Sequence, residues 1–329
     1  MSKNQTIGPW VRRFLMEHVM GERNLASNTQ RSYRDTFRLL LPFLARRCRQ
    51  PVDQLQIKHL SPKVLREFFQ HLSQTRRCGP STVNQRLAAL RAWAGFVGTQ
   101  SPEHVEWSGR VRGLCFKKTP YPLMPYLEKA EMQALLHAPN RNHPQGIRDH
   151  ALLLFLYNTG ARASETAQLT VADLDFTLCA VTLHGKGGKD RCCPLWKSTV
   201  TVLKQVIGRR SNDAPVFLNQ RGQALTRFGI HTLVERHSAK AKLRVASPKT
   251  KRISPHTIRH TTAMHLLRAG VDINTIRAWL GHVSLQTTHV YAQSDLEMKA
   301  KALAQCELSL QRPSRHKSDH GVLAFLETI

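Results

Sequence analysis

A histidine and an arginine stand one helical turn apart in the sequence SPHTIRH. Ser254 and Pro255 are typical of a helix N-cap and of the first helical residue. His256 and Arg259, at i and i+3, therefore share one face of the predicted helix. A guanidinium binds two phosphate oxygens at once, and an imidazole moves protons near neutral pH. Residues 236–259 hold eight Lys and Arg and no Asp or Glu. The pair indicates phosphate chemistry in an electropositive setting.

Three further segments carry residues of the same chemical kind. The sequence TGARASE contains Arg162, with Glu165 three residues later in position to orient its guanidinium. The Gly-rich sequence HGKGGKDR carries Lys186 between two predicted strands. Near the C-terminus, LGH ends in His282, and Tyr291 follows nine residues later. The glycine in LGH allows the left-handed conformation that stops a helix. Any one of these could be a core or surface residue; their combination is what suggests a site.

Two other catalytic classes do not match the sequence. The run GKGGKD has neither the spacing of a phosphate-binding nucleotide loop nor the dinucleotide fingerprint. His256 and His260 stand at i and i+4, as in zinc proteases, but Thr257 occupies the position that requires glutamate. The sequence predicts neither a nucleotide cofactor nor a metal site.

The chain is strongly basic along its whole length. Its 329 residues include 49 Lys and Arg against 22 Asp and Glu, a formal net charge of +27. Residues 1–119 hold 21 basic and 7 acidic side chains, and residues 120–329 hold 28 and 15. Such an excess indicates a polyanionic partner, with nucleic acid as the first candidate. A generally solubilising surface is the alternative.

Composition also predicts where the protein works. The longest apolar run, Ala151–Tyr157, is far too short to span a membrane. The first residues, MSKNQTIGPWVRR, lack the apolar segment of a secretory signal. The seven cysteines form no C-x-x-C pair, which favours reduced thiols over disulfides or a zinc ribbon. We expect a cytoplasmic protein without a membrane partner.

Residues 1–109 are predicted to form a helical domain. Apolar residues recur at spacings of three and four over 27–45, 62–73 and 81–97. The first of these helices opens with a cap signal at Ser27. Its polar face carries a basic stripe: Arg31, Arg34 and Arg38. Arg86 and Arg91, on the third helix, are left for solvent or phosphate. A solvated helix face is the alternative for any single arginine.

The rest of the chain is predicted to be a linker, a mixed domain and a tail. Residues 110–126, rich in Gly and Pro, have no apolar period and indicate an extended linker. In the domain 127–311, strands over 180–184 and 190–195 flank a hairpin turn. Helices are predicted over 128–137, 147–158, 163–169, 198–208, 226–238, 255–269, 272–280 and 286–303. The tail 312–329 is polar and then apolar. The fold class is mainly α with a small β-sheet (α+β).

The order and spacing of these motifs resemble the tyrosine recombinases, the phage integrase family. The matching text is TGARASE, HGKGGKDR, SPHTIRHTTAMHLLRAGVDINTIRAWLGH and SLQTTHVYA. The resemblance covers about residues 126–303. It extends more loosely to residues 27–97, which look like the helical DNA-binding domain of the family. The resemblance implies a helical N-terminal domain and a mixed catalytic domain that form a clamp on DNA.

The resemblance implies a site-specific DNA recombinase that cuts and rejoins strands without metal or ATP. Tyr291 would be the nucleophile, giving a 3′-phosphotyrosyl link and a free 5′-hydroxyl. The implied partners are double-stranded DNA with inverted-repeat-like core sites and further copies of the chain, in a tetramer on synapsed DNA. A need for accessory proteins stays open.

Five other residues would assist the tyrosine, by the same resemblance. Arg162 and Arg259 would bind the non-bridging oxygens of the scissile phosphate. His282 would be a further donor to these oxygens. Lys186 would protonate the leaving 5′-oxygen, and His256 would be the acid/base partner near the tyrosine.

Two alternatives stay open at the level of sequence. Type IB topoisomerases use a related Arg/Lys/Arg/His/Tyr site to relax DNA. A DNA-binding regulator or architectural protein would carry the same residues as a vestigial site. For a recombinase, the sequence does not choose between integration, transposition of a mobile element and resolution of chromosome dimers. We expect the apolar end of the tail, Gly321–Ile329, to dock on a neighbouring protomer.

Overall fold

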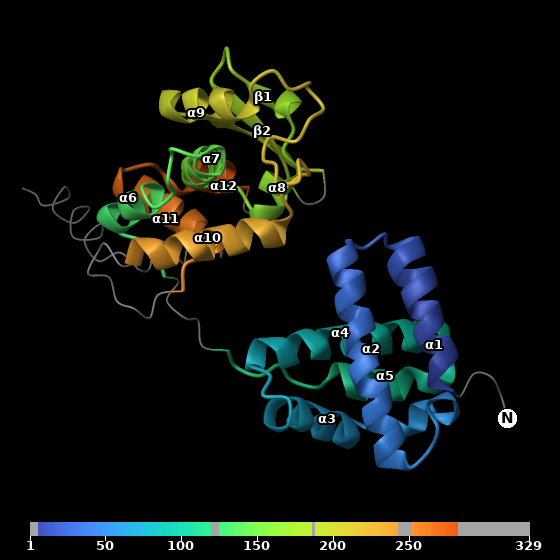
Figure 1. Ribbon diagram of the computed structural model, residues 1–329. Helices are drawn as coiled ribbons and strands as arrows, with labels where there is room; N and C mark the ends of the chain where they lie inside the picture. Colours follow the sequence, from blue (N-terminus) through green and yellow to red (C-terminus); the bar gives the residue numbers. More distant parts are fainter. Residues whose placement is uncertain (1–5, 120–124, 186–187, 243–251, 282–329) are drawn as a thin grey trace, which may run out of the picture. The chain divides into compact units, whose positions relative to one another are not determined.

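The computed structural model describes residues 6–119, 125–185, 188–242 and 252–281 (Figure 1). The chain divides into two compact units, Met1–Pro122 and Leu123–Ile329. The described part is mainly helical with one small sheet, which confirms the predicted fold class. The predicted helix 286–303 and the tail 312–329 lie outside the described residues.

The first unit is built from helices around an aromatic and aliphatic core. Its elements are α1 (Ile7–Arg13), the π-helix η1 (Phe14–Glu22), α2 (Ser27–Cys48), η2 (Val52–Gln54), η3 (Ile57–His59), α3 (Pro62–Gln74), α4 (Pro80–Gln100), η4 (Pro102–His104) and α5 (Val105–Arg112). Helix α4 packs against α2, α3 and α5. Its Trp93 is 1% exposed and meets Phe37 of α2 edge-on, with ring centroids 5.4 Å apart.

Helix α2 begins and ends differently from the prediction. Ala26 is its N-cap, without a side-chain cap bond, so the predicted Ser27 cap is wrong. Ser27 itself is already helical. The helix continues beyond residue 45 to Cys48 and stops where Arg49 adopts a left-handed conformation, with φ of 53°. Its predicted apolar face is confirmed, because Phe37, Leu40 and Leu44 are buried in the core.

Arg86 is not available to solvent or phosphate in the way the sequence suggested. Its Nη1 donates to the Ser32 carbonyl at 2.9 Å and to Thr36 Oγ1 at 3.3 Å, both on α2. The neighbouring Gln85 donates to Ser32 Oγ at 2.9 Å. These bonds tie α4 to α2, so the charge of Arg86 serves packing between helices.

The start of the predicted linker is also wrong. Helix α5 runs to Arg112, so residues 110–112 are helical rather than extended. The following segment is held on the first unit by Asn84 of α4. The Asn84 side chain donates to the Lys117 carbonyl and accepts from the Lys117 N–H, both at 2.8 Å. Lys117 Nζ also donates to Ser73 Oγ at 2.9 Å. The other predicted domain boundaries stay predictions.

The second unit combines helices with a three-stranded antiparallel sheet in the order β1-β2-β3. Its elements are α6 (Lys129–Leu136), α7 (Pro144–Thr159), α8 (Ala163–Gln168), η5 (Val171–Asp173), β1 (Leu174–Asp175), β2 (Ala180–His184), β3 (Asp190–Pro194), α9 (Lys197–Ile207), α10 (Arg227–Lys242), α11 (Pro255–Arg268) and α12 (Ile273–Leu280). The two predicted strands are confirmed and pair in register, with Val181 opposite Cys193. The two-residue strand β1 is an addition to the prediction.

Helix α7 is the centre of the second unit. It packs against α9 and α11, and α10 packs against α6 and α8 (Figure 1). Its side chains are buried on almost every side, including Leu152, Leu153 and Phe155. Neither α7 nor any other helix in the described ranges is long and apolar enough to cross a membrane. Because α7 is enclosed, its C-terminal end is held firmly, and the candidate site begins there.

Candidate active site

The turn after α7 positions the first candidate residue. Gly160 has a left-handed backbone with φ of 61°, which ends α7. A β-carbon at Gly160 would lie 2.5 Å from Leu280 Cδ2, so the close approach of α12 requires glycine. The Ala161 N–H donates to Thr159 Oγ1 at 3.2 Å. Arg162 follows as the N-cap of α8.

Arg162 is held by Glu165, as the sequence suggested. Its Nη1 donates to Glu165 Oε1 at 2.6 Å, and its backbone N–H donates to Glu165 Oε2 at 2.8 Å. The Glu165 side chain is 4% exposed and that of Arg162 is 32% exposed. The carboxylate therefore fixes the buried side of a guanidinium that keeps an accessible side.

Glu165 stays ionised despite its burial. Burial raises the pKa of this carboxyl, but hydrogen bonds and charges from Arg191 and Arg162 outweigh that effect and lower the pKa to about 2. At neutral pH the site therefore contains a buried carboxylate between two guanidinium groups.

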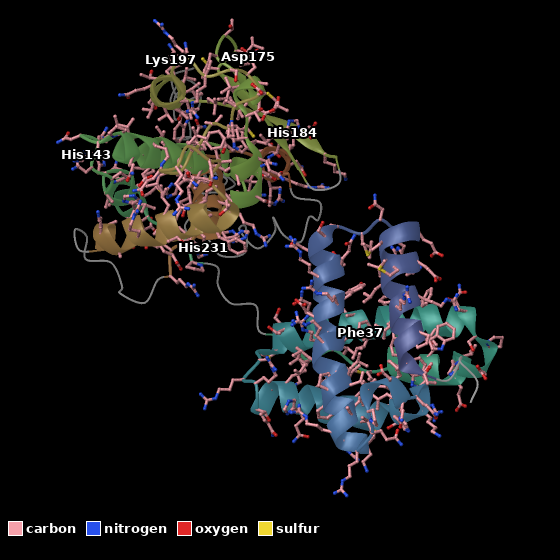
Figure 2. All side chains as sticks on the ribbon, turned by 45° about the vertical axis from the view of Figure 1, so that its right-hand side comes forward. Phe37, His143, Asp175, His184, Lys197 and His231 are labelled. Atoms are coloured by element: carbon pink, nitrogen blue, oxygen red, sulfur yellow. The ribbon has the colours of Figure 1, made fainter. Side chains whose placement is uncertain are left out.

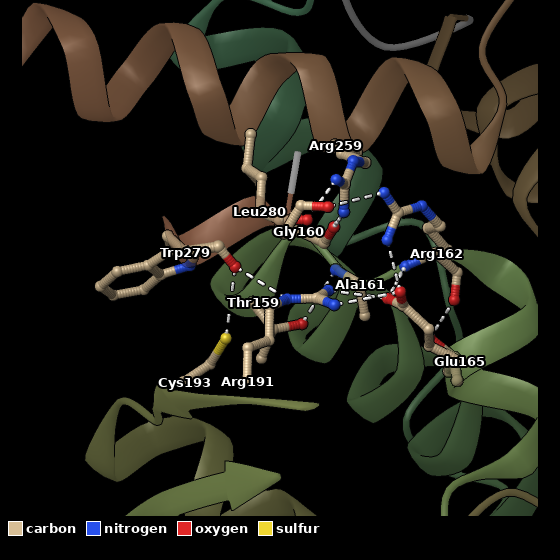
Figure 3. Close-up of polar contacts among 12 residues, drawn as sticks. Thr159, Gly160, Ala161, Arg162, Glu165, Arg191, Cys193, Arg259, Trp279 and Leu280 are labelled. Carbon is tan, nitrogen blue, oxygen red and sulfur yellow. Dashed lines mark hydrogen bonds and ion pairs between the residues drawn. The ribbon is translucent and has the colours of Figure 1, made fainter. Parts of the chain in front are cut away.

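Arg259 approaches the same turn from α11. Ser254 caps this helix by accepting the Thr257 N–H at 3.3 Å, and Pro255 is its first residue, as predicted. Arg259 is only 4% exposed. Its Nη1 donates to the Gly160 carbonyl at 2.6 Å, and its Nη2 donates to the Leu280 carbonyl. Figure 3 shows the Arg259 and Arg162 guanidinium groups beside one another at this turn.

The end of α12 connects the arginines. Gly281 adopts the left-handed conformation predicted for it, with φ of 63°. The last carbonyls of a helix have no partner within the helix and carry partial negative charge. Here the Trp279 carbonyl accepts from Arg191 Nε at 2.9 Å, and the Leu280 carbonyl accepts from Arg259 Nη2 (Figure 3). The Gly281 carbonyl accepts from Arg162 Nη2 at 3.1 Å. Three arginines from three elements thus cap one helix end.

Arg191 is the site residue that the sequence reasoning missed. It lies on β3, and its side chain is 8% exposed. Its Nη1 and Nη2 donate to the two oxygens of Glu165 at 3.0 and 2.7 Å. One signal was present in the sequence. Arg191 and Cys193 stand two residues apart on the predicted strand, so they share a face. If that face is buried, as Cys193 is in the structure, the charge of Arg191 needs a partner.

His256 lies on the exposed surface of α11. Within the described part of the chain, no hydrogen bond involves its ring. Partial burial and the charges of Arg259 and Arg162 lower the pKa of His256 from its ordinary value of 6.5. Burial, with His256 and Arg259 nearby, lowers the pKa of His260 to about 4. Both imidazoles are therefore neutral at physiological pH, and a neutral imidazole can accept a proton.

The other three predicted site residues lie outside the described residues: Lys186, His282 and Tyr291. The hairpin on either side of Lys186 is described. The Gly185 N–H donates to the Lys189 carbonyl at 3.0 Å. At the base of the hairpin, His184 contacts Asp190 and Asp173, each at 3.0 Å. Hydrogen bonds to these carboxylates raise the pKa of His184. Figure 2 shows His184 at the edge of the second unit.

The described residues of the candidate site carry donors that suit an anion. Among them, no three His, Cys, Asp or Glu side chains gather in the way that would hold a metal ion. Arg162 and Arg259 instead bring positive charge to one point, and Arg162 is partly open to solvent. Two guanidinium groups, with the neutral imidazole of His256 on the same helix as Arg259, suit a phosphodiester, whose oxygens accept from arginine.

Family comparison covers both units. The family described as "Phage integrase family" matches residues 125–298. The family described as "Phage integrase, N-terminal SAM-like domain" matches residues 11–97. The first match alone spans more than half of the chain.

Individual relatives agree with the family match. The protein y4rC of Sinorhizobium fredii, provisionally named an integrase/recombinase, is 35% identical over 332 residues and covers 100% of both chains. Tyrosine recombinase XerC of Pelobacter propionicus is 31% identical over 290 residues, 85% of this chain and 89% of XerC. Tyrosine recombinase XerD of Vibrio cholerae is 31% identical over 278 residues, 82% of this chain and 87% of XerD.

Solved structures share the fold. The Tn1549 transposon integrase in complex with a circular intermediate DNA has a TM-score of 0.69 at 16% identity, covering 90% of this chain and 99% of that chain. The XerH site-specific recombinase bound to palindromic difH substrate has a TM-score of 0.64 at 20% identity, covering 88% and 82%. The family match and these relatives show that the chain belongs to the phage integrase family of tyrosine recombinases, enzymes that break and rejoin DNA strands at specific sites.

Proposed function

We propose that Arg162 and Arg259 bind the two non-bridging oxygens of the scissile phosphate. The observation that carries the proposal is their convergence on one turn, where their donors reach the carbonyls of Gly160, Leu280 and Gly281. Preorganised donors of this kind stabilise the extra negative charge of a pentavalent transition state. The Arg162 side chain is 32% exposed, so one side of its guanidinium is accessible to a phosphate.

The proposed reaction proceeds through covalent catalysis by Tyr291. The Tyr291 oxygen attacks phosphorus and loses its proton to His256, while the bond from phosphorus to the 5′-oxygen breaks. Lys186 gives a proton to the leaving 5′-oxygen, and His282 donates to a non-bridging oxygen. The products are a 3′-phosphotyrosyl link and a free 5′-hydroxyl. A 5′-hydroxyl from another strand reverses these steps and rejoins the DNA.

The electrostatics around His256 support its part in this scheme. A proton acceptor must be neutral at the working pH, and partial burial together with neighbouring positive charges keeps the pKa of His256 below 6.5. The imidazole is also exposed and has no hydrogen bond to a described residue. It is therefore open to a tyrosine and a DNA strand.

The basic charge and the relatives support a proposal for the partner and the assembly. We propose duplex DNA with inverted-repeat-like core sites, clamped by the two basic units, and a tetramer on synapsed DNA. Solved relatives include a lambda integrase dimer bound to a core site and the Tn1549 transposon integrase with a circular intermediate DNA. Among integration, transposition and dimer resolution, we propose movement of a mobile element, in the cytoplasm, as the role; the Tn1549 transposon integrase shares the fold.

Covalent trapping tests the proposed chemistry. Duplex sites selected from a random-sequence DNA library would be prepared with a nick, so that the short strand carrying the 5′-hydroxyl diffuses away after cleavage. We expect wild type to accumulate a covalent protein–DNA product and Tyr291→Phe to form none. Tyr33→Phe is the matched control, because the ring that stacks on Phe14 at 5.6 Å is kept and only a hydroxyl is lost.

Each outcome of this assay has a distinct meaning. No covalent product with wild type on DNA that it binds would overturn the proposal and favour a regulator with a vestigial site. Relaxation of supercoiled DNA that carries a single site, without recombination between two sites, would instead favour a topoisomerase-like activity. Full trapping by an Arg162→Ala or Arg259→Ala variant would overturn the assignment of the phosphate-binding pair.

A further inference from the structure

Arg191 has no assigned role in the reaction, yet it joins three segments of the site. Its guanidinium donates to both oxygens of Glu165 at 3.0 and 2.7 Å, and its Nε donates to the Trp279 carbonyl at 2.9 Å. A β-carbon on Gly281 would lie 3.2 Å from Arg191 Cδ and Nη1. Arg191 thus packs against Gly281 at the end of α12, and Figure 3 shows its bond to the Trp279 carbonyl.

Each segment that Arg191 joins carries a different candidate catalytic residue. Glu165 holds Arg162 through Oε1 at 2.6 Å. Strand β3, on which Arg191 lies, is one arm of the hairpin that carries Lys186. The end of α12 leads directly into His282 in the sequence. A buried side chain at the junction of these segments can fix their positions relative to one another without contacting DNA.

The charge balance of the site also depends on Arg191. Glu165 is buried and ionised, and if it faced Arg162 alone it would cancel the positive charge meant for a phosphate. Arg191 supplies a second guanidinium, so the three side chains together keep one net positive charge. The planar fork of arginine suits this pairing, because it binds both carboxylate oxygens at once, which a lysine ammonium cannot match.

We propose that Arg191 is a positioning residue for strand cleavage. Its guanidinium balances the negative charge of Glu165, so that the positive charge of Arg162 stays available to the scissile phosphate and its guanidinium stays aligned with that phosphate. The inference rests on the proposed role of Arg162. The Arg191 side chain is 8% exposed, so we expect it to make no contact with DNA. Its loss affects the chemical step and leaves non-covalent binding unchanged.

The experiment compares cleavage of two nicked substrates by Arg191→Lys and Arg191→Gln in the full chain. One substrate has an ordinary scissile phosphate, and the other has a methylphosphonate, which lacks the negative charge that Arg162 stabilises. Strand cleavage, DNA affinity and thermal unfolding are measured for each variant. Arg210→Lys is the matched control, because the Arg210 guanidinium also donates to internal acceptors, the carbonyls of residues 206, 207, 215 and 216.

We expect Arg191→Gln to lose about 100-fold in cleavage of the phosphate, the size of effect that a small misplacement of a catalytic group produces. Arg191→Lys loses less, since it keeps the charge. On the methylphosphonate both losses shrink to a few-fold, and DNA affinity stays within about twofold of wild type. Arg210→Lys affects the two substrates equally.

Equal losses on the two substrates, or full cleavage by Arg191→Gln, would overturn the inference. If Arg191→Gln does not fold, Arg191→Lys carries the same comparison. An Arg162→Lys variant distinguishes failure of the proposed function from failure of the positioning role of Arg191. If Arg162→Lys cleaves the phosphate as fast as wild type, the proposed function fails. If Arg162→Lys is defective and both Arg191 variants are not, only the positioning role of Arg191 fails.

Discussion

Glu165 is the residue whose burial matters most to the candidate site. Its two oxygens accept from Arg162 and Arg191, and its side chain is 4% exposed. Removing one member of a buried ion pair leaves the partner charge without compensation. Glu165→Gln would leave two guanidinium groups facing each other across an amide.

We expect Glu165→Gln to lower the free energy of unfolding by about 3–5 kcal/mol, measured by urea denaturation at pH 7. The matched control is Glu106→Gln. Glu106 pairs with Arg110 on the surface of α5 and is 83% exposed, so its substitution should change stability by less than about 0.5 kcal/mol. Equal effects of the two substitutions would contradict the assigned importance of the buried pair.

The contribution of Glu165 should also depend on pH. Its pKa in the fold is about 2, below its ordinary value of 4.5. The fold therefore favours the ionised form, and the resulting stabilisation is complete above pH 4.5 and is lost as the pH falls toward 2. The difference in unfolding free energy between wild type and Glu165→Gln should shrink over this range in pH-dependent urea titrations. A difference that stays constant would rule out the ionised carboxylate as its source.

His256 gives a pH prediction of its own, for cleavage rather than stability. Its pKa is lowered from 6.5, so the neutral, proton-accepting imidazole persists into mildly acidic solution. We expect the cleavage rate on a nicked substrate to fall on the acid side with a midpoint below pH 6.5. His256→Asn should remove this limb and slow cleavage about 100-fold or more. A midpoint above 6.5 would argue against His256 as the acceptor.

Contacts of single residues could be predicted from the sequence where the two partners lie close together along the chain. Glu165 follows Arg162 by three residues, and their contact was predicted correctly. Arg191 was missed because its partners lie far along the chain, 26 residues away at Glu165 and 88 residues away at Trp279. Arg86 was misjudged for the same reason. Its acceptors lie on another helix, and the helical period alone cannot show that an arginine forms hydrogen bonds to a neighbouring helix.

At the scale of elements, the site depends on how closely two helix ends approach. Gly160 ends α7 with φ of 61°, and a β-carbon there would lie 2.5 Å from Leu280 Cδ2 of α12. The carbonyls of both residues accept from Arg259. Displacing one helix end would therefore displace the arginine.

We expect Gly160→Ala to destabilise the protein by about 2–5 kcal/mol, from left-handed strain together with overpacking against Leu280, and to reduce cleavage more than DNA binding. Gly222→Ala is the matched control. Gly222 has φ of 72° but open space around it, so only the strain of about 1 kcal/mol applies. Thermal unfolding and covalent trapping check both variants. Similar destabilisation by the two substitutions would show that the contact with α12 is unimportant.

Elements with strong local signals were predicted well. Helix α11 has a serine cap and a first-turn proline, and α12 ends in a left-handed glycine. The boundaries that failed have a physical reason. Helix α2 starts from Ala26 with no side-chain cap, and β1 is two residues long and exists through pairing with β2. Such features follow from contacts made in the folded protein, which a periodicity search does not include.

Across the whole molecule, the excess of basic residues is divided between the two units, and some of these residues form ion pairs with acidic side chains of the protein itself. On α2 the predicted stripe is exposed, but Arg34 pairs with Asp35 at 2.8 Å. Among the described residues, Arg31 and Arg38 form no ion pair. These two arginines are therefore better placed than Arg34 to neutralise DNA phosphates.

We expect Arg31→Gln and Arg38→Gln each to lower the slope of log affinity against log salt by about 0.9, the value for one phosphate contact on duplex DNA. Arg34→Gln, as the matched control, should change the slope less, because its charge is already offset. Fluorescence anisotropy on a duplex site at several salt concentrations gives these slopes. Three equal changes would contradict a role for the Arg34–Asp35 pair.

The attachment of Lys117 to Asn84 limits the reach of the protein along its substrate. Lys117 is fixed to the first unit, and the Leu127 N–H is fixed in the second unit by Thr261 Oγ1 at 2.9 Å. Only nine residues, 118–126, separate these anchors. A fully extended chain covers about 3.5 Å per residue, so the anchors can be at most roughly 35 Å apart. That is about one turn of duplex DNA. Whatever the order of binding, Lys117 and Leu127 stay within about one helical repeat of each other on DNA.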